Sequence, residues 1–326
     1  MTSILLTGVC IVYFVIQVQL LYPLTLSIYT WSTGNLAPFL SEPTFSQYSS
    51  SHCAIILFVI LCIICSKKDM SFFMKAGSIG VIFIFMLTFF IMYTGFAALS
   101  NTEFMIGSTA ASKETDWEKP IRTLTLIAPN IGPLAGIFGL GYFLHPVSLP
   151  IVRSAARPEN NDRDIFLGYL FVFISYILLG TLGYIGFIGF DFASYFEGKE
   201  GTATDGQINQ NCLSMFSYTE VPAFILRLAI FLLIFSGYPL VHFFLTQGLI
   251  KLIFGEGERK NVSRLTELCF GWLIIVFGLL FALFYPNIGL VLSYVGAVCG
   301  FVIVYLLPVM VDIAQSREEI QLKLRG

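Results

Sequence analysis

Charged residues are scarce in this sequence. Only 12% of its 326 residues are Asp, Glu, Lys or Arg, whereas 56% are hydrophobic. Soluble domains carry about 25% charged residues, so this deficit excludes a soluble globular domain and predicts an integral membrane protein. The net charge of −2 is uninformative about nucleic acid, but no run of basic residues suggests a nucleic-acid-binding surface, and we expect none.

Motifs of catalysis, metal binding and ion conduction are missing as well. The sequence has no HExxH, G-x-S-x-G or Walker A motif, and its three histidines (His52, His145, His242) are far apart. Cys62 and Cys65 have CxxC spacing but lie in an apolar run without a second pair, so we expect no metal or redox site. No TVGYG filter or Arg-periodic helix indicates a channel. We therefore expect neither an enzyme nor a cofactor.

Long hydrophobic runs are what the chain does have. A search for runs of about 20 apolar residues predicts eight transmembrane helices and an all-α multi-pass membrane protein. No soluble domain separates them, so we expect one transmembrane domain over residues 1–314 and a cytosolic tail over 315–326. The predicted spans are 4–26, 46–66, 76–99, 126–152, 165–190, 221–250, 268–286 and 288–312.

The loops between these runs differ in charge. If both ends of the chain are cytosolic, 13 of the 18 Lys and Arg residues fall on the cytosolic side. This bias follows the positive-inside rule and predicts the orientation. The predicted non-cytosolic loops are then 100–125 and 191–220.

The run 132–153 is apolar yet rich in helix-breaking residues. It contains four glycines, three prolines and the ionisable His145. Prolines remove backbone donors and glycines add backbone freedom, so a continuous helix is disfavoured. Broken helices of this kind form substrate sites in secondary transporters, whereas a kinked packing helix is the plainer alternative. His145 could serve proton coupling, or it could donate to a carbonyl that a proline leaves free.

The predicted span 221–250 also contains polar groups. Ser236 precedes Gly237, Tyr238 and Pro239, so hydroxyl and carbonyl oxygens suited to Na⁺ occur together. The alternative is that Ser236 bonds a carbonyl of its own helix beside a proline kink. Arg227 is expected to snorkel toward the non-cytosolic end. The run 227–232 also matches a loose sterol-contact pattern, so we expect lipid and sterol contacts there.

Two cysteines fall at the predicted non-cytosolic face. Cys212 lies in a loop and Cys53 begins a span. They could form a disulfide in an oxidising lumen, or they could remain two unpaired thiols.

Several segments together resemble the amino acid/auxin permease family. The similarity is specific over about 134–312 and weaker over 1–100. The segments that carry it are N-N-D-R-D at 160–164 with Tyr169, Tyr176 and Gly180; Y-P-L at 238–240 with I-F-G at 253–255; and F-Y-P-N-I-G at 284–289 with Tyr294, Gly296, Ala297, Cys299 and Gly300.

This resemblance implies a fold and a site. The family has a LeuT-like arrangement of inverted repeats, and it transports amino acids by alternating access with Na⁺ or H⁺ as coupling ion. The eight spans are similar to the family's third to tenth. The implied substrate site comprises Phe138, Gly139, Gly141, Tyr142 and His145, and the implied ion path Ser236 and Tyr238. The implied membrane is lysosomal or endosomal.

The chain also departs from the family pattern. We expect it to lack the first two spans, the last span, and the N-terminal segment through which a family member engages Ragulator and Rag GTPases. No such engagement is therefore expected here. The alternative to a transporter is a truncated membrane scaffold or nutrient-sensing regulator that does not transport.

Overall fold

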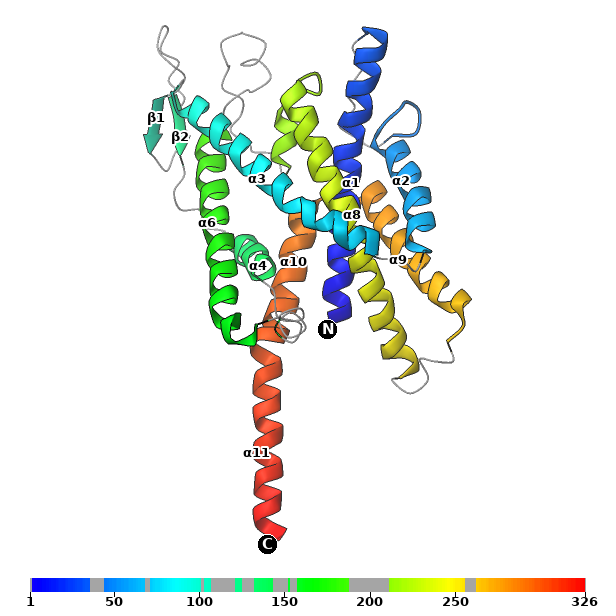
Figure 1. The fold of residues 1–326 in the computed structure, drawn as a ribbon, viewed down its shortest axis with the longest axis vertical. Helices are drawn as coiled ribbons and strands as arrows, with labels where there is room; N and C mark the ends of the chain where they lie inside the picture. Colours follow the sequence, from blue (N-terminus) through cyan, green and yellow to red (C-terminus); the bar gives the residue numbers. More distant parts are fainter. Residues whose placement is uncertain are drawn as a thin grey trace.

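The computed structural model is an elongated bundle of helices (Figure 1). It describes residues 2–35, 44–67, 71–100, 103–106, 121–124, 132–142, 152, 157–187, 211–255 and 262–325. Among these, the principal helices are α1 (Thr2–Thr33), α2 (Ser50–Cys65), α3 (Ser71–Ser100), α4 (Gly132–Gly141), α6 (Asn161–Phe187), α8 (Val221–Phe254), α9 (Arg264–Phe284), α10 (Ile288–Gly300) and α11 (Leu307–Arg325).

These helices confirm the all-α, multi-pass membrane architecture. Five of them are long and apolar enough to cross a bilayer, and α2 and α10 are shorter apolar helices. Each predicted span contains a helix, although α2 begins at Ser50, four residues into the span 46–66, and α9 ends at Phe284, two residues before the end of 268–286. The helix in the predicted span 126–152 is α4, which ends at Gly141 and is followed by a turn at Tyr142.

Two short elements were not expected from the sequence. Strands β1 (Glu103–Ile106) and β2 (Ile121–Leu124) pair in parallel, with Glu103 opposite Ile121, inside the predicted loop 100–125. A π-helical turn, Phe301–Leu306, joins α10 to α11. The helix then continues to Arg325 and extends away from the bundle (Figure 1).

Helix α1 forms the centre of the bundle. It contacts α2, α8, α9 and α10, and its residues Cys10, Phe14 and Val18 belong to the main buried cluster. A second cluster joins Leu20 of α1 to Ile91 of α3, Phe187 of α6 and Leu226 of α8. Both buried clusters therefore include residues of α1. Polar residues of α1 are surrounded by protein on several sides.

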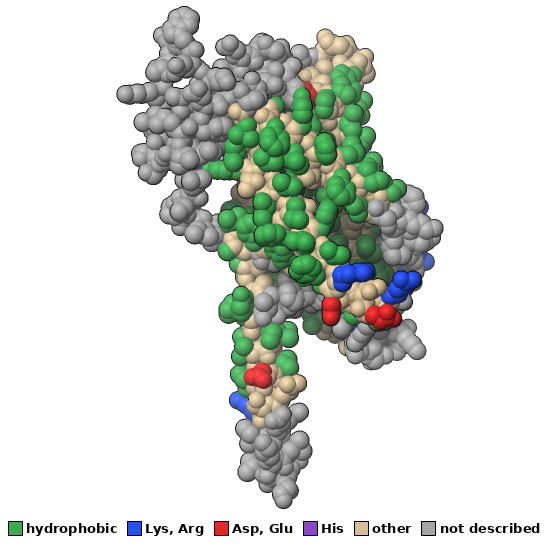
Figure 2. Space-filling view, turned by 60° about the vertical axis from the view of Figure 1, so that its left-hand side comes forward, with side chains coloured by type: hydrophobic (Ala, Val, Ile, Leu, Met, Phe, Trp, Pro, Cys, Tyr) green, Lys and Arg blue, Asp and Glu red, His purple; other side chains and the backbone are tan. Residues whose placement is uncertain are grey.

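The outer surface is apolar, as lipid contact requires. The face in Figure 2 is covered by hydrophobic side chains, and Lys, Arg, Asp and Glu gather at its lower edge. Exposed residues such as Phe89 on α3 and Phe166 on α6 are normal where lipid replaces water as the surrounding medium.

Arg227 of α8 binds the segment before that helix, which contains the short 3-10 helix Cys212–Met215. Its side chain is only 2% exposed, and its guanidinium donates to the carbonyl oxygens of Leu213 at 2.7 Å, Phe216 at 2.6 Å and Ser217 at 3.2 Å. We expected the Arg227 side chain to extend to water at the non-cytosolic end of its span. It ends on protein carbonyl oxygens instead. A guanidinium has five donors in a fixed fork, which is why one residue can hold a whole turn of backbone.

Helices α3 and α6 meet through glycines. A Cβ atom at Gly186 would lie 2.5 Å from the Cα of Gly95, and one at Gly95 would lie 2.9 Å from the carbonyl oxygen of Leu182. The two backbones are thus in direct contact, as the small-residue spacing in the sequence of α6 predicts.

The α3–α6 contact generates a stability prediction. Gly186→Ala would place a methyl group against the backbone of Gly95, and such overpacking costs about 1–3 kcal/mol. Gly180→Ala is the control, because a Cβ there meets nothing within 4 Å. We expect thermal unfolding of the detergent-solubilised protein to shift downward for Gly186→Ala only. Equal unfolding temperatures for the two variants would contradict the contact.

The Arg227 contacts generate a second prediction, read out at Cys212. Burial raises the pKa of the Cys212 thiol, although backbone hydrogen bonds offset part of this, so the native thiol should alkylate slowly near neutral pH. Arg227→Gln should free the 213–217 carbonyls and speed alkylation of Cys212 by about tenfold, because the loss of a buried charged donor costs more than 1 kcal/mol.

Peptide mass spectrometry after N-ethylmaleimide treatment measures that rate at Cys212. The control is Arg163→Gln, which removes an exposed arginine that pairs with Asp164 at 3.0 Å. An unchanged rate in Arg227→Gln would show that the segment is held by other contacts.

Candidate functional site

The C-terminal end of α4 carries most of the predicted substrate residues. Phe138 and Gly139 belong to the last turn of α4, Gly141 is its final residue, and Tyr142 follows as a turn with its N–H bonded to the carbonyl oxygen of Phe138 at 3.1 Å. Phe138 and Tyr142 stack, with ring centroids 6.5 Å apart. The helix end is accordingly well defined up to Tyr142, whereas His145 lies outside the described residues.

Tyr176 of α6 fixes this helix end. Its hydroxyl donates to the carbonyl oxygen of Gly141 at 3.2 Å, and its ring meets that of Tyr142 edge-on, with centroids 5.3 Å apart. A Cβ at Gly141 would lie 3.0 Å from the Tyr176 hydroxyl oxygen. Any larger residue at position 141 must therefore displace Tyr176. On its other side α4 lies against α10, where a Cβ at Gly136 would collide with the backbone of Ser293.

Tyr13 of α1 lies against α8. It packs against the main buried cluster, and its ring would contact a Cβ at Gly237 of α8, at 3.7 Å. Tyr176 thus joins α6 to α4, and Tyr13 joins α1 to α8.

Gln17 is the site residue that sequence reasoning missed. Its side chain is 0% exposed, and within the described structure neither its amide nitrogen nor its amide oxygen makes a hydrogen bond. Leaving a buried polar group unpaired costs about 1–3 kcal/mol, so this amide lowers the stability of the folded protein. The only signal in the sequence was one carboxamide in the middle of an apolar run.

The register of α1 against α8 places Gln17 near Ser236. The two helices are antiparallel: a Cβ at Gly248 would lie 3.3 Å from Ser3 Oγ, Tyr13 faces Gly237, and Trp31 meets Phe224 with centroids 4.8 Å apart. Gln17 follows Tyr13 by one helical turn and so shares its face. Interpolation puts it level with the turn of α8 that contains Ser236.

Ser236 itself is bonded within its own helix. Its hydroxyl donates to the carbonyl oxygen of Leu233 at 2.8 Å, which is the plainer of the two alternatives, and α8 runs through Pro239 as one helix. Proline has no N–H, so the carbonyl of Phe235 lacks its usual helical donor. Oxygen lone pairs of Ser236 and Phe235 therefore remain as potential ligands at about the level of Gln17.

Tyr238 lies on a different side of α8. Two residues along a helix are separated by about 200°, so Ser236 and Tyr238 cannot face the same partner. Tyr238 is fully buried in the main cluster, near Cys10, Cys62 and Cys65, and its hydroxyl makes no hydrogen bond to any described residue. The structure thus separates the two residues of the predicted ion path.

Of the two alternatives for Cys53 and Cys212, the structure has two unpaired thiols. Cys53 Sγ is instead 3.1 Å from the Tyr48 hydroxyl and 3.9 Å from Thr25 Oγ1, inside the main cluster, while Cys212 packs against the second cluster. The two cysteines face different parts of the core, which loop position alone did not reveal.

The chemistry of this region suits a small zwitterion. The C-terminal end of a helix carries the negative end of the helix dipole, so the end of α4 favours an ammonium group or a cation over a carboxylate. The Gln17 amide can donate to a carboxylate and accept from an ammonium. Across the described part of the chain no three His, Cys, Asp or Glu residues gather as a metal site would require.

Comparison with known proteins identifies a family. The family model described as "Transmembrane amino acid transporter protein" matches residues 1–324. The chain is 30% identical over 249 residues to the sodium-coupled neutral amino acid transporter 9 homolog of Caenorhabditis elegans, covering 76% of this chain and 36% of that protein. It is 26% identical to neutral amino acid transporter 9 of Rattus norvegicus, covering 77% and 41%, and 25% identical to that of Danio rerio, covering 82% and 44%. The chain therefore spans about two fifths of the length of these relatives.

The unpaired amide predicts an unusual mutational effect. Gln17→Met keeps the length of the side chain but removes its polar groups, so it should stabilise the protein by about 1 kcal/mol or more. Gln19→Met is the control, because Gln19 donates to the carbonyl oxygen of Pro286 at 3.1 Å and should lose stability or stay unchanged. Thermal unfolding in detergent measures both. A lower unfolding temperature for Gln17→Met would mean that the amide is already satisfied.

Proposed function

Because this chain belongs to the transmembrane amino acid transporter protein family, we propose that it takes part in moving an amino acid across a membrane by secondary transport. The observation that carries the proposal is the Gln17 amide, which is wholly buried and makes no hydrogen bond to any described residue. A bound amino acid would supply the missing partners. The relatives reported above are named as transporters and not as enzymes.

The proposed site lies between α1, α4, α6 and α8. The end of α4 at Gly139 and Gly141 receives the ammonium of the substrate, because a helix C-terminus favours positive charge. Gln17 bonds the carboxylate through its NH₂ group. Phe138 and Tyr142, whose rings stack at this helix end, contact the substrate side chain.

The coupling ion is proposed to be Na⁺ or H⁺. For Na⁺, the hard oxygen ligands available at about the level of Gln17 are Ser236 Oγ and the carbonyl of Phe235, which Pro239 leaves without a helical donor. For H⁺, His145 is the candidate carrier. Flux measured with and without a Na⁺ gradient separates the two, since only Na⁺ coupling makes flux depend on that gradient.

Transport requires that one group of helices moves against another. The contacts described here suggest a division: α1, α2, α8 and α9 share the main cluster together with the first turn of α10, whereas α4 is held by Tyr176 of α6 and by α10. We propose that the second group rocks against the first around the substrate. Both ends of the chain are proposed to be cytosolic and the membrane lysosomal or endosomal, on the basis of the basic loops and the family resemblance. Co-localisation of a tagged chain with a lysosomal membrane marker tests the location.

Uptake of labelled arginine or leucine into proteoliposomes tests the site. Gly141→Leu should reduce uptake by about tenfold or more, because it forces Tyr176 off the end of α4 and distorts the geometry that holds the ammonium. The matched control is Gly180→Leu on α6, where a side chain enters open space and uptake should stay near the wild-type level.

Two results would speak against the proposal. Equal flux in wild type and Gly141→Leu would remove the end of α4 from the substrate path. Flux no greater than in protein-free vesicles for the wild type, under either ion gradient, would favour a scaffold or regulator that does not transport.

A further inference from the structure

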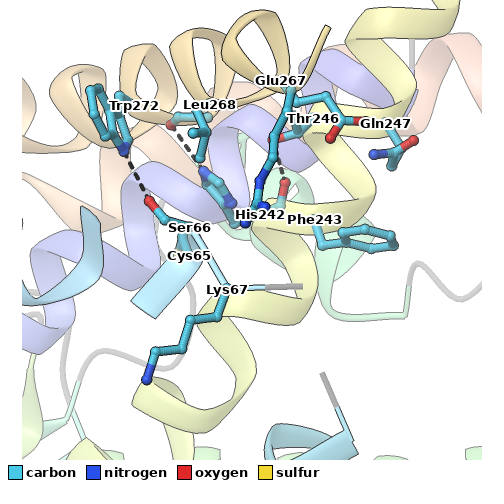
Figure 3. Close-up of a pocket in the computed structure, with 12 residues that line it drawn as sticks. Cys65, Ser66, Lys67, His242, Phe243, Thr246, Gln247, Glu267, Leu268 and Trp272 are labelled. Atoms are coloured by element: carbon cyan, nitrogen blue, oxygen red, sulfur yellow. Dashed lines mark hydrogen bonds between the residues drawn. The ribbon is translucent and has the colours of Figure 1, made fainter. Parts of the chain in front are cut away.

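A polar pocket, separate from the proposed transport site, lies at the end of the bundle where α2 ends and α9 begins. It has a volume of about 360 Å³, which is within the range of small-molecule sites. Residues from three helix regions line it (Figure 3): Cys65, Ser66 and Lys67 after α2; His242, Phe243, Thr246 and Gln247 of α8; and Arg264, Glu267, Leu268, Gly271 and Trp272 of α9. None of these residues belongs to the proposed transport site.

Hydrogen bonds between the helices hold the walls of this pocket. Trp272 Nε1 donates to Ser66 Oγ at 3.2 Å and joins α9 to the end of α2. His242 Nε2 lies 2.9 Å from the carbonyl oxygen of Gly271 and must donate, because a carbonyl oxygen only accepts. Thr246 donates to the carbonyl oxygen of His242 at 2.9 Å. These bonds are shown as dashed lines in Figure 3. The pocket is therefore formed before any ligand arrives.

Two cations flank the pocket. Lys67 and Arg264 come from different helices, and both are exposed. In Figure 3 the Lys67 side chain extends away from the helices. Glu267 also lines the pocket, so the charges fit a group that carries an ammonium beside its phosphate better than a bare polyanion.

The surroundings of the pocket are those of a membrane interface. The partly exposed Trp272 forms one wall, and tryptophan is enriched where the apolar core of a bilayer meets the headgroups. Along α9, Leu265 and Leu273 are exposed and apolar, so they offer a surface for an acyl chain next to the pocket. Basic pockets between transmembrane helices on the cytosolic side are known places for lipid headgroups.

We propose that this pocket binds the phosphate-bearing headgroup of an anionic phospholipid, such as phosphatidylserine, from the leaflet at this end of the bundle. Lys67 and Arg264 contact the phosphate, the polar wall of His242 and Thr246 faces the headgroup, and the acyl chains lie on the exposed face of α9. The loop charges predict this leaflet to be the cytosolic one. The site is separate from the substrate path, so it can be tested without any measurement of transport.

Trp272 provides the reporter for the test. The chain has three tryptophans, Trp31, Trp117 and Trp272. In a Trp31→Phe/Trp117→Phe background, the fluorescence of Trp272 is measured in phosphatidylcholine bilayers that contain increasing fractions of brominated phosphatidylserine or brominated phosphatidylcholine. Bromine quenches only when the lipid lies next to the indole, so half-maximal quenching reports the relative affinity for the two lipids.

The proposal predicts that brominated phosphatidylserine quenches at about a tenfold lower mole fraction than brominated phosphatidylcholine. Lys67→Gln/Arg264→Gln should abolish this preference. Arg157→Gln/Arg317→Gln is the matched control, because it removes two exposed cations that do not line the pocket, and the preference should survive. All four changes are at exposed positions, so folding is expected to be unaffected.

Three outcomes would overturn the proposal. Trp272 could show no preference between the two lipids, or Lys67→Gln/Arg264→Gln could retain the preference. As a third outcome, soluble phosphoserine or inorganic phosphate at millimolar concentration would relieve the quenching of Trp272. The pocket would then be a site for a soluble phosphate compound and not for a lipid.

Discussion

The need to pair every buried polar group inside the protein governs this structure. In the apolar part of a membrane protein, water does not satisfy a donor or acceptor, and an unpaired group costs several kcal/mol. Arg227 meets this constraint by bonding three carbonyls, and in doing so it positions the 213–217 segment. Gln17 does not meet it within the described structure. We propose a structural role for Arg227 and a binding role for Gln17, although the Tyr238 hydroxyl is likewise unpaired among the described residues.

The helices form one compact group and a second region where several of them meet. The group α1, α2, α8 and α9 is built around α1 and includes the hydrogen-bonded wall of the polar pocket. The end of α4 is held by Tyr176 of α6. Because the two polar regions share no lining residue, substrate chemistry and lipid contact can be varied independently.

The sequence predicted the features that depend on composition and local patterns. Apolar runs located the helices, and the glycines and prolines of 132–153 marked a place where the helix ends, at Gly141. It could not predict features that depend on which helix faces which. Gln17 stands out only once α1 is known to be central, and Ser236 and Tyr238 turned out to face different sides of α8. Of the two alternatives for Cys53 and Cys212, the structure has the unpaired thiols, with Cys53 next to Tyr48 and Thr25.

The central claim is that the buried amide of Gln17 is kept for a ligand. Equilibrium binding of labelled leucine and arginine to the purified chain, measured by scintillation proximity in detergent, tests it most directly. The account predicts saturable binding by the wild type and at least about tenfold weaker binding by Gln17→Met, a variant expected to be more stable. Equal affinity in the two proteins would contradict the account, because a ligand that pairs with this amide must lose affinity when the amide is removed.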